Sequence, residues 1–598
     1  MYFWNSAVSV IRQTQQPRRG FRGHVFVLSS LTSALVLLVV RLTSAQFPIA
    51  CLNDNDLREQ KCCPVVTVGN SVGAECGGPG RGACKRIESS HCHVETPDDP
   101  AHVLAYLKNP VSEPSRYPWP NRVFTQICEC EGNWTGYDCT ECKFGYVKTA
   151  DESVCVKRKT PLVRRNYMTL NDDERDYVKQ TIADMNDRSK SPSRYGVLIS
   201  EKNFSKSSHL KSNVTAEDFK FGISAFEFLA WIHYYAAKDS GGSFDNDHLA
   251  KVDFAHNGPS FTTWHRYFML LFESELQRVS GNDSFAAPYW DWMDRQNRDH
   301  IFTHPDVFDG NETSLVGVFR DFRVICFNAG FAVPLSEPNI IQRTPKRGPG
   351  SLCNASQFDV GIPLVRRDYG QHEYKVVKWL PSTRDAWDIL LNITHYDIPH
   401  HKLFPGCPSS LRAALEGSVA VPGKRYCSLA NESVVVEIHN AVHMYPGGVL
   451  ASGAMSPNDP VFYLHHSMVD RMFERFIIKL QELGTLQYIP ESGGDPGHNA
   501  NDCIVPSFPV YRNKEFLKRS TDFGYVYDTL PLLDTAPERP AEEYNQCNNP
   551  NESTIMPRPS LSPSASASPR LPLSIEKSAY GRLLGMVSAL VSQLYELL

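Results

Sequence analysis

The chain has little excess of charge of either sign. Its 61 lysines and arginines and 66 aspartates and glutamates leave a net charge of −5 over 598 residues. Proteins that bind nucleic acid usually present a strongly basic surface, and this balance gives no sign of one. The sequence also has no internal repeat apart from a duplicated pattern of histidines. Nucleic-acid partners are therefore not expected.

Long apolar runs are scarce as well. The stretch Val25–Val40 follows three arginines and precedes the small residues Thr43–Ala45. It is short for a bilayer span, which needs about 20 residues. We therefore expect residues 1–45 to be a signal peptide that sends the chain into the secretory pathway. Residues 574–598 resemble a short amphipathic helix, because Arg582 and Glu596 interrupt the apolar residues, so membrane association stays open.

Cysteines are concentrated in one segment. Of the 17 cysteines, 11 lie between Cys51 and Cys155, a density typical of a disulfide-rich module in an oxidising compartment. The odd number leaves one thiol without a local partner, and Cys92 is our candidate. A zinc site at Cys139-x-x-Cys142 is the alternative to disulfides there.

Six histidines in two sets are the most informative feature. In the first set, the apolar stripe of FGISAFEFLAWIHYYAAKD predicts a helix that carries His233. His256 precedes a Gly-Pro breaker, and His265 is expected to open a helix that ends at Gly281. A single histidine beside an apolar face is usually an ordinary core residue. Three in these contexts predict a metal site.

The second set has the more diagnostic spacing. His439 and His443 lie four residues apart and so on one face of a helix. After the turn residues Asn458–Pro460, a second amphipathic helix carries His466. We expect Asp470, on the same face, to fix the tautomer of a histidine ligand. Neutral imidazole suits copper, zinc, iron and nickel, so spacing alone leaves the metal open.

The motifs around these histidines carry a family resemblance. HNGPSFTTWHRYF, PYWDW, HNAVH and NDPVFYLHH closely resemble the copper-binding signatures of tyrosinases, particularly animal tyrosinases and tyrosinase-related proteins. The resemblance extends in order from about Cys51 to Tyr527. It implies two copper ions, with zinc as the alternative, held by the six histidines as ligands: His233, His256, His265, His439, His443 and His466.

The resemblance also implies roles for other residues. Glu416 and Asn440 match the pair that positions a water which deprotonates the phenol, and Phe462 matches an aromatic over the second copper. His465 stands where tyrosinase-related proteins usually have leucine and tyrosinases have histidine, and it is expected beside the ligands. Residue 254 is Phe, so the cysteine–histidine thioether of fungal and molluscan members is absent.

Disulfides outside the cysteine-rich segment are less defined. Cys326 with Cys353 matches a bridge of the family. We pair Cys407 with Cys427 because the two are close in the sequence, and Cys503 with Cys547 because they are the two cysteines that are left.

The predicted fold is mainly α, with an antiparallel four-helix bundle enclosing a dinuclear copper site. We expect a signal peptide at 1–45, a cysteine-rich EGF-like domain at 46–158 and a catalytic domain at 159–547. A Pro/Ser-rich disordered linker at 548–573 and the C-terminal segment at 574–598 follow. Nine Asn-x-Ser/Thr sequons are candidate glycan sites: Asn133, Asn203, Asn213, Asn282, Asn311, Asn354, Asn392, Asn431 and Asn551.

The resemblance implies a copper-dependent monophenol and o-diphenol oxidase that uses dioxygen to convert small phenols, tyrosine and L-DOPA, to o-quinones in melanin-type pigment synthesis. The alternatives are a tyrosinase-related protein, acting as a zinc dopachrome tautomerase or a dihydroxyindole oxidase, and a non-catalytic oxygen carrier. The expected location is the secretory pathway, with the protein in the melanosome lumen or membrane, or secreted.

Overall fold

A computed structural model describes residues 46–531 with gaps, the longer of which are 88–115, 204–212, 238–252, 326–363, 368–379, 398–409, 417–437 and 489–496. The predictions for residues 1–45 and 548–598 lie outside the described residues. So do those for Cys92 and for the pairs Cys326 with Cys353 and Cys407 with Cys427. Cys503 is disulfide-bonded, but Cys547 also lies outside.

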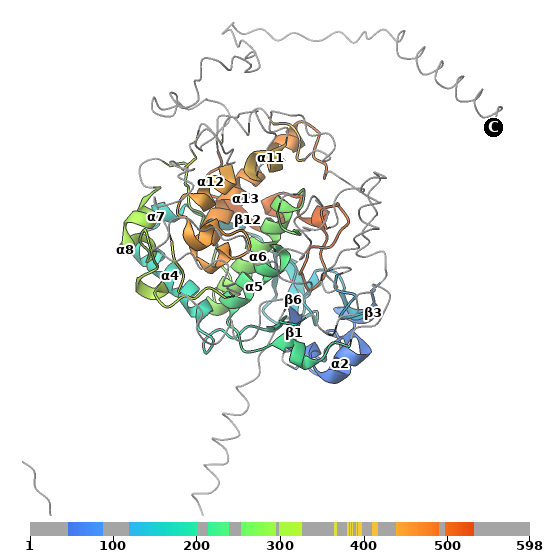
Figure 1. Ribbon diagram of the computed structural model, residues 1–598. Helices are drawn as coiled ribbons and strands as arrows, with labels where there is room; N and C mark the ends of the chain where they lie inside the picture. Colours follow the sequence, from blue (N-terminus) through green and yellow to red (C-terminus); the bar gives the residue numbers. More distant parts are fainter. Residues whose placement is uncertain are drawn as a thin grey trace, which may run out of the picture. The chain divides into compact units, whose positions relative to one another are not determined.

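Nine helices lie in the described part of the chain (Figure 1), and they supply many of its buried hydrophobic side chains. They are α2 Asp54–Glu59, α4 Asp172–Asn186, α5 Ala225–Ala237, α6 Phe261–Ser280, α7 His300–Thr303, α8 Pro305–Phe308, α11 Leu411–Glu416, α12 Ile438–Met444 and α13 Val461–Glu482.

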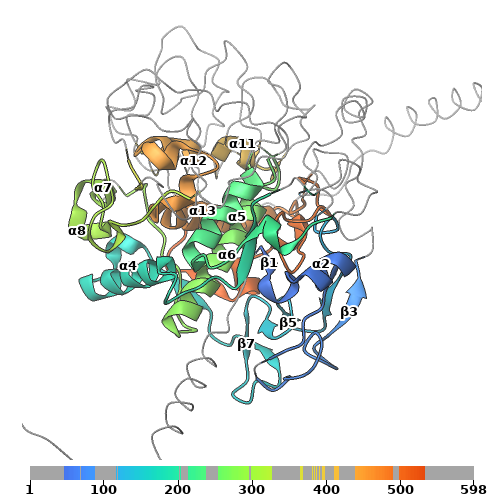
Figure 2. The ribbon, with the colours of Figure 1, turned by 60° about the horizontal axis from the view of Figure 1, so that its bottom comes forward.

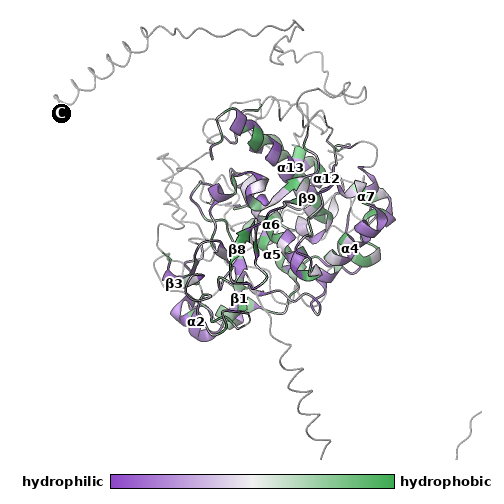
Figure 3. Ribbon diagram, turned by 180° about the vertical axis from the view of Figure 1, so that it is seen from behind, coloured by the Kyte–Doolittle hydropathy of each residue, from purple (hydrophilic) through white to green (hydrophobic). Residues whose placement is uncertain are grey.

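Helix boundaries follow local sequence signals. Asn171 and Glu174 form a reciprocal capping box at the start of α4. Gly281, with a φ of 65°, ends α6 at the predicted position. The predicted start of this helix at His265 is wrong, because α6 already begins at Phe261 and His265 lies in its second turn. Helix α5 is apolar on nearly all sides and buried, whereas α2 is largely hydrophilic (Figure 3).

The strands among the described residues are short and form five small sheets. Their orders are β1-β10-β11, β12-β9, β2-β4-β3, β5-β6 and β7-β8. The bounds are β1 Phe47–Pro48, β2 Lys61–Cys62, β3 Gly82–Arg86, β4 Gln126–Cys130, β5 Trp134–Thr135, β6 Glu141–Cys142, β7 Tyr146–Lys148, β8 Cys155–Lys157, β9 Leu162–Arg164, β10 Tyr195–Leu198, β11 Phe219–Lys220 and β12 Tyr525–Tyr527.

Five disulfides hold the cysteine-rich segment together. They pair ten of its eleven cysteines: Cys51–Cys62, Cys63–Cys84, Cys76–Cys128, Cys130–Cys139 and Cys142–Cys155. Cys139 and Cys142 are thus in separate bridges, so the zinc alternative at this pair is wrong. These bridges replace part of the apolar core that so small a module cannot build.

The cysteine-rich segment also contacts the helical part of the chain. Strand β1 pairs antiparallel with β10, and Thr135 Oγ1 lies 2.8 Å from the hydroxyl of Tyr511. Arg194 forms an ion pair with Glu141. Within the described residues, no helix combines the length and hydropathy needed to span a membrane.

Five of the helices lie close together in the described part of the chain. Helix α6 packs against α13, α11 packs against α12, and α5 contacts the 3-10 turn Ser456–Asn458 that precedes α13. Figure 2 shows α5, α6 and α13 side by side, with α12 next to them. This grouping brings the two histidine sets together, although they are far apart in the sequence.

Candidate metal centre

The first histidine cluster is built from a helix, a loop and a second helix. His233 comes from α5, His256 from the loop before α6, and His265 from α6 itself. The three ring nitrogens lie within 4.8 Å of one another. The rings of His233 and His256 have centroids 4.8 Å apart, and those of His256 and His265 4.9 Å. The three predicted positions of the first set therefore meet in space.

The second cluster is tighter. His439 and His443 lie one turn apart on α12, as their spacing predicts, and His466 faces them from α13. The Nε2 atom of His443 lies 3.0 Å from that of His439 and 3.1 Å from that of His466. The Nε2 atoms of His439 and His466 are 3.3 Å apart. Three imidazole nitrogens thus point at one place.

The two clusters adjoin each other across α6 and α13. The rings of His265 and His466, one from each cluster, stack with centroids 4.3 Å apart and an angle of 17°. Phe462 is fully buried beside both, 4.1 Å from the His466 ring and 5.1 Å from the His233 ring. The aromatic surroundings keep bulk water away from the histidines.

Most of the rings are oriented by hydrogen bonds from Nδ1. A carbonyl oxygen can only accept, so an imidazole that bonds one through Nδ1 carries its proton there and has a bare lone pair at Nε2. Backbone carbonyls serve three of the histidines: Phe261 O at 2.8 Å from His265, Leu450 O at 3.0 Å from His443 and Ala454 O at 3.4 Å from His233. The lone pairs therefore face the interior of each cluster.

Burial keeps most of these rings neutral. It lowers the pKa of His443 to about 3 and those of His233, His265, His439 and His466 well below the ordinary value, with neighbouring histidines adding to the shift. His256 differs. Burial lowers its pKa, but Asp253 and, more weakly, Glu416 raise it above the ordinary value.

The donor set fits metal ions. Bare imidazole lone pairs at 3.0 to 3.3 Å repel one another unless a cation lies between them. Imidazole binds an ion such as zinc at about 2.0–2.1 Å, which places tetrahedrally arranged nitrogens roughly 3.3 Å apart. In the first cluster, the buried Nε2 atoms of His233 and His265 have no hydrogen-bond partner among the described residues. Each cluster can therefore hold one ion with three imidazole nitrogen ligands.

Glu416 and Asn440 lie next to the second cluster. The Asn440 side chain accepts a hydrogen bond of 2.9 Å from Nδ1 of His439 and donates one of 2.6 Å to the backbone oxygen of Glu416. Glu416 is the last residue of α11 and is buried. Its charge reaches His256 of the first cluster. The two predicted residues are thus linked to each other and to both clusters.

His465 lies with the second cluster. Its ring stacks on that of His439, with centroids 5.1 Å apart, and contacts the ring of His443 at 4.7 Å. Its nitrogens lie within 4.8 Å of those of the three other histidines. His300 and His395 are described and belong to neither cluster, whereas His248, His400 and His401 lie outside the described residues.

Two residues that orient the first cluster were not found from the sequence. The Asp253 carboxylate accepts hydrogen bonds from Nδ1 of His256 at 3.1 Å and from its backbone N–H at 2.9 Å. Burial raises the pKa of Asp253, but the charge and hydrogen bond of His256 bring it down to about 2. His498 is buried and donates from Nε2 to the backbone oxygen of Asp253 at 2.6 Å. Its Nδ1 lies 2.7 Å from Ser260 Oγ.

The role expected for Asp470 is wrong. Its carboxylate accepts hydrogen bonds from Arg266 at 2.6 Å and Arg164 at 3.2 Å, and from the hydroxyls of Tyr525 and Tyr527. No histidine bonds it among the described residues. Two buried guanidinium groups need a buried negative charge beside them. Asp470 of α13 supplies it, and its ion pair with Arg266 connects α13 to α6.

Known proteins resemble the chain over most of its length. The common central domain of tyrosinase matches residues 223–479. A tyrosinase from Pelophylax lessonae is 31% identical over 506 residues, which cover 84% of each chain. A 5,6-dihydroxyindole-2-carboxylic acid oxidase from Carassius auratus is 28% identical over 513 residues, covering 84% of this chain and 87% of the relative. A solved polyphenol oxidase from Thermothelomyces thermophila matches 64% of this chain and 89% of its own, with 18% identity and a TM-score of 0.37.

The central domain contains both histidine clusters, and together with the match to tyrosinases they place the chain among the type 3 copper oxidases. The chain belongs to the tyrosinase family, as its motifs predicted, and is an oxidoreductase that acts on phenols. It is an enzyme that binds copper.

Proposed function

We propose that this protein is a copper-dependent monophenol and o-diphenol oxidase that converts tyrosine and L-DOPA to o-quinones. The observation that carries the proposal is the pair of adjoining clusters, each with three imidazole rings directed into it. We assign His233, His256 and His265 to one copper ion and His439, His443 and His466 to the other. A pair of coppers supplies dioxygen activation when bound.

The proposed reaction balances with one dioxygen. One oxygen atom enters the ring beside the phenol hydroxyl, the other leaves as water, and the phenol is oxidised to the o-quinone. A phenol has a pKa of about 10, so its proton must be removed near neutral pH. We assign this step to a water held by Glu416 and Asn440, because both lie beside the second cluster and Asn440 bonds its ligand His439.

The architecture is proposed to be the antiparallel four-helix bundle of α5, α6, α12 and α13. The packing of α6 on α13 and the stacking of His265 on His466 support this arrangement. The five disulfides support passage through an oxidising, secretory compartment. Pigment formation in a melanosome, or outside the cell, is the setting that we propose for the activity.

Substitution Glu416→Gln tests the assignment of the base. It should leave copper content unchanged and depress tyrosine hydroxylation more than L-DOPA oxidation, because a catechol chelates the metal pair more readily without a separate base. Removal of a general base commonly costs about 10²–10⁴-fold. Initial rates on both substrates, at matched copper content, measure the difference.

The control is Glu482→Gln at the exposed end of α13, which should leave both rates unchanged. Equal small losses on both substrates would mean that Glu416 has only a structural role. Loss of copper would mean that it supports a ligand instead.

A further inference from the structure

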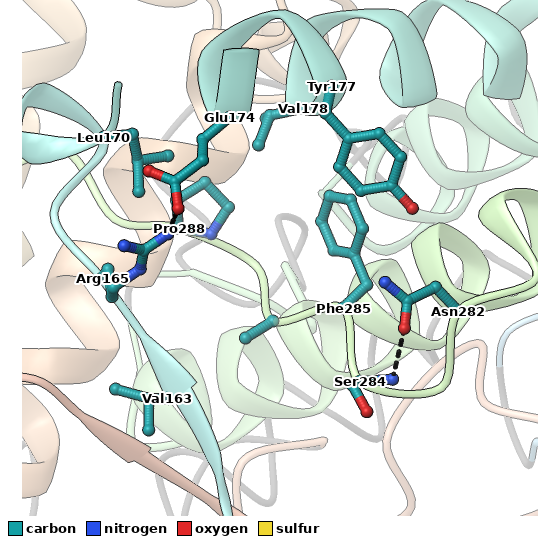
Figure 4. Close-up of a pocket in the computed structure, with 11 residues that line it drawn as sticks. Val163, Arg165, Leu170, Glu174, Tyr177, Val178, Asn282, Ser284, Phe285 and Pro288 are labelled. Carbon is teal, nitrogen blue, oxygen red and sulfur yellow. Dashed lines mark hydrogen bonds and ion pairs between the residues drawn. The ribbon is translucent and has the colours of Figure 1, made fainter. Parts of the chain in front are cut away.

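A surface cavity on the side of α4 has features that the oxidase reaction does not use. Its volume is about 210 Å³. Walls from α4, β9 and the segment after α6 surround it (Figure 4). Two of the large hydrophobic side chains that the described surface leaves exposed line it, Tyr177 at 45% and Val163 at 47% exposure. Apolar side chains gathered in a hollow offer a surface on which the apolar face of a ligand can pack.

Aromatic rings form one wall of the cavity. Tyr177 and Phe285 lie with ring centroids 5.2 Å apart and their planes tilted by 39°. Polar groups lie at the other end, where Arg165 and Glu174 form an ion pair. A pyranose ring has an apolar C–H face that packs on aromatic rings and hydroxyls that bond charged groups, so this wall chemistry suits a sugar.

A glycosylation sequon stands at the rim of the same cavity. Asn282, Asp283 and Ser284 form Asn-x-Ser directly after the glycine that ends α6, and all three residues are exposed. The Asn282 side-chain oxygen accepts a hydrogen bond of 3.0 Å from the backbone N–H of Ser284. The same side chain lines the cavity. Figure 4 shows its nitrogen turned toward the Phe285 ring.

We propose that Asn282 carries an N-linked glycan whose first N-acetylglucosamine lies in this cavity, against Tyr177 and Phe285. The amide nitrogen forms a bond to the anomeric carbon of an oligosaccharide carried on a lipid pyrophosphate. The bond from that carbon to the pyrophosphate breaks, the pyrophosphate leaves with the electron pair, and the amide loses one proton. The sugar then covers the exposed apolar groups and connects α4 to the end of α6.

The cavity is well separated from the histidine clusters. Asn282 follows His265 by seventeen residues, most of them in α6, and at 1.5 Å per residue this is about 25 Å along the helix. The proposal is therefore independent of the oxidase activity, and its test does not require a loaded metal site.

The test uses the full chain secreted from a eukaryotic cell, with glycopeptide mass spectrometry. Wild type should carry a hexosamine-based glycan at Asn282. Ser284→Ala should lose it, and Ser284→Thr should keep it, because threonine preserves the sequon. An unmodified Asn282 in secreted wild-type protein would overturn the proposal.

Enzymatic deglycosylation of the native protein tests the position of the first sugar. We expect release at Asn282 to be about tenfold or more slower in native than in denatured protein, because packing on aromatic rings shields the bond that is cut. Tyr177→Ala should restore fast release, and Tyr177→Phe should remain slow. Release that is equally fast in native and denatured wild type, or unaffected by Tyr177→Ala, would show that the sugar does not lie in the cavity.

Discussion

His256 is the residue whose environment differs most from that of the other proposed ligands. It comes from a loop rather than a helix, and a carboxylate, that of Asp253, fixes its Nδ1. The other clustered histidines for which such a bond is described use carbonyl oxygens. A loop position lacks the rigidity of a helix, so its orientation depends more on this bond.

Asp253→Asn should weaken the first metal site selectively. The amide has no negative charge, so it holds the His256 ring less firmly, and loss of such a support commonly costs about 10–100-fold in metal affinity. When the concentration of a chelator is raised stepwise, the variant should lose one copper ion at low concentration and retain the second. The exposed control Asp522→Asn should match wild type. Simultaneous loss of both ions would contradict a local role.

The six clustered histidines could be found from sequence, but most of their partners could not. Spacing and flanking motifs singled out the six because each lies in a recognisable helix or turn context. Asp253 lies three residues before His256, so an acidic residue at that spacing was an available signal. His498 follows Asp253 by more than 240 residues, and no local pattern connects the two.

At the scale of elements, helix α6 links the metal centre to a buried ionic network. Its residue Arg266 bonds both Asp470 and Glu474 of α13, and Glu273 of the same helix bonds Arg164 of β9. These groups are almost fully buried. The network therefore fixes how α6 lies on α13, and with it the stacking of His265 on His466.

Asp470→Ala should destabilise the protein strongly. It leaves Arg164 and Arg266 buried with one carboxylate partner fewer, and breaking a buried ion pair commonly costs about 3–5 kcal/mol. Denaturant unfolding of the metal-free protein measures the change. Asp321→Ala, in an exposed pair with Arg320, should cost less than about 1 kcal/mol. Similar small losses in both variants would show that the network contributes little.

Amphipathic patterns and end signals predicted α5, α6, α12 and α13, but the sequence did not indicate the partner of Asp470. Asp470 lies one turn after His466, which correctly places both on one helix. Sequence periodicity predicts the helix face on which a residue lies, but not which charged side chains from other segments pack against that face. Arg164 and Arg266 lie in elements that are far from Asp470 in the sequence. Because both guanidinium groups are buried and need a negative charge nearby, the Asp470 carboxylate points toward them rather than toward a histidine.

At the scale of the whole molecule, the cysteine-rich segment and the helical part are connected by more than the continuous chain. The pairing of β1 with β10 and the bond between Thr135 and Tyr511 cross from one to the other. Connectivity of the disulfides was not predictable, because even eight cysteines allow about 105 pairings. The domain boundaries and the four-helix bundle stay predictions.

The central claim is that two ions of copper lie in the two clusters of one chain. Their close approach rests on the stacked rings of His265 and His466, and their chemistry on six imidazole donors. Five of the six donors lie on α5, α6, α12 and α13, so helix packing positions them. The apolar core around α12 and α13 should therefore survive loss of one ligand.

Metal analysis of the purified protein, combined with absorption spectroscopy, tests this claim most directly. Wild type should contain about two coppers per chain and develop a near-ultraviolet charge-transfer band when hydrogen peroxide is added. His439→Ala should lose the second copper, the band and the activity, while His300→Ala, outside both clusters, should keep all three. Two zinc ions per wild-type chain, with no band and no oxidation of L-DOPA, would contradict the account.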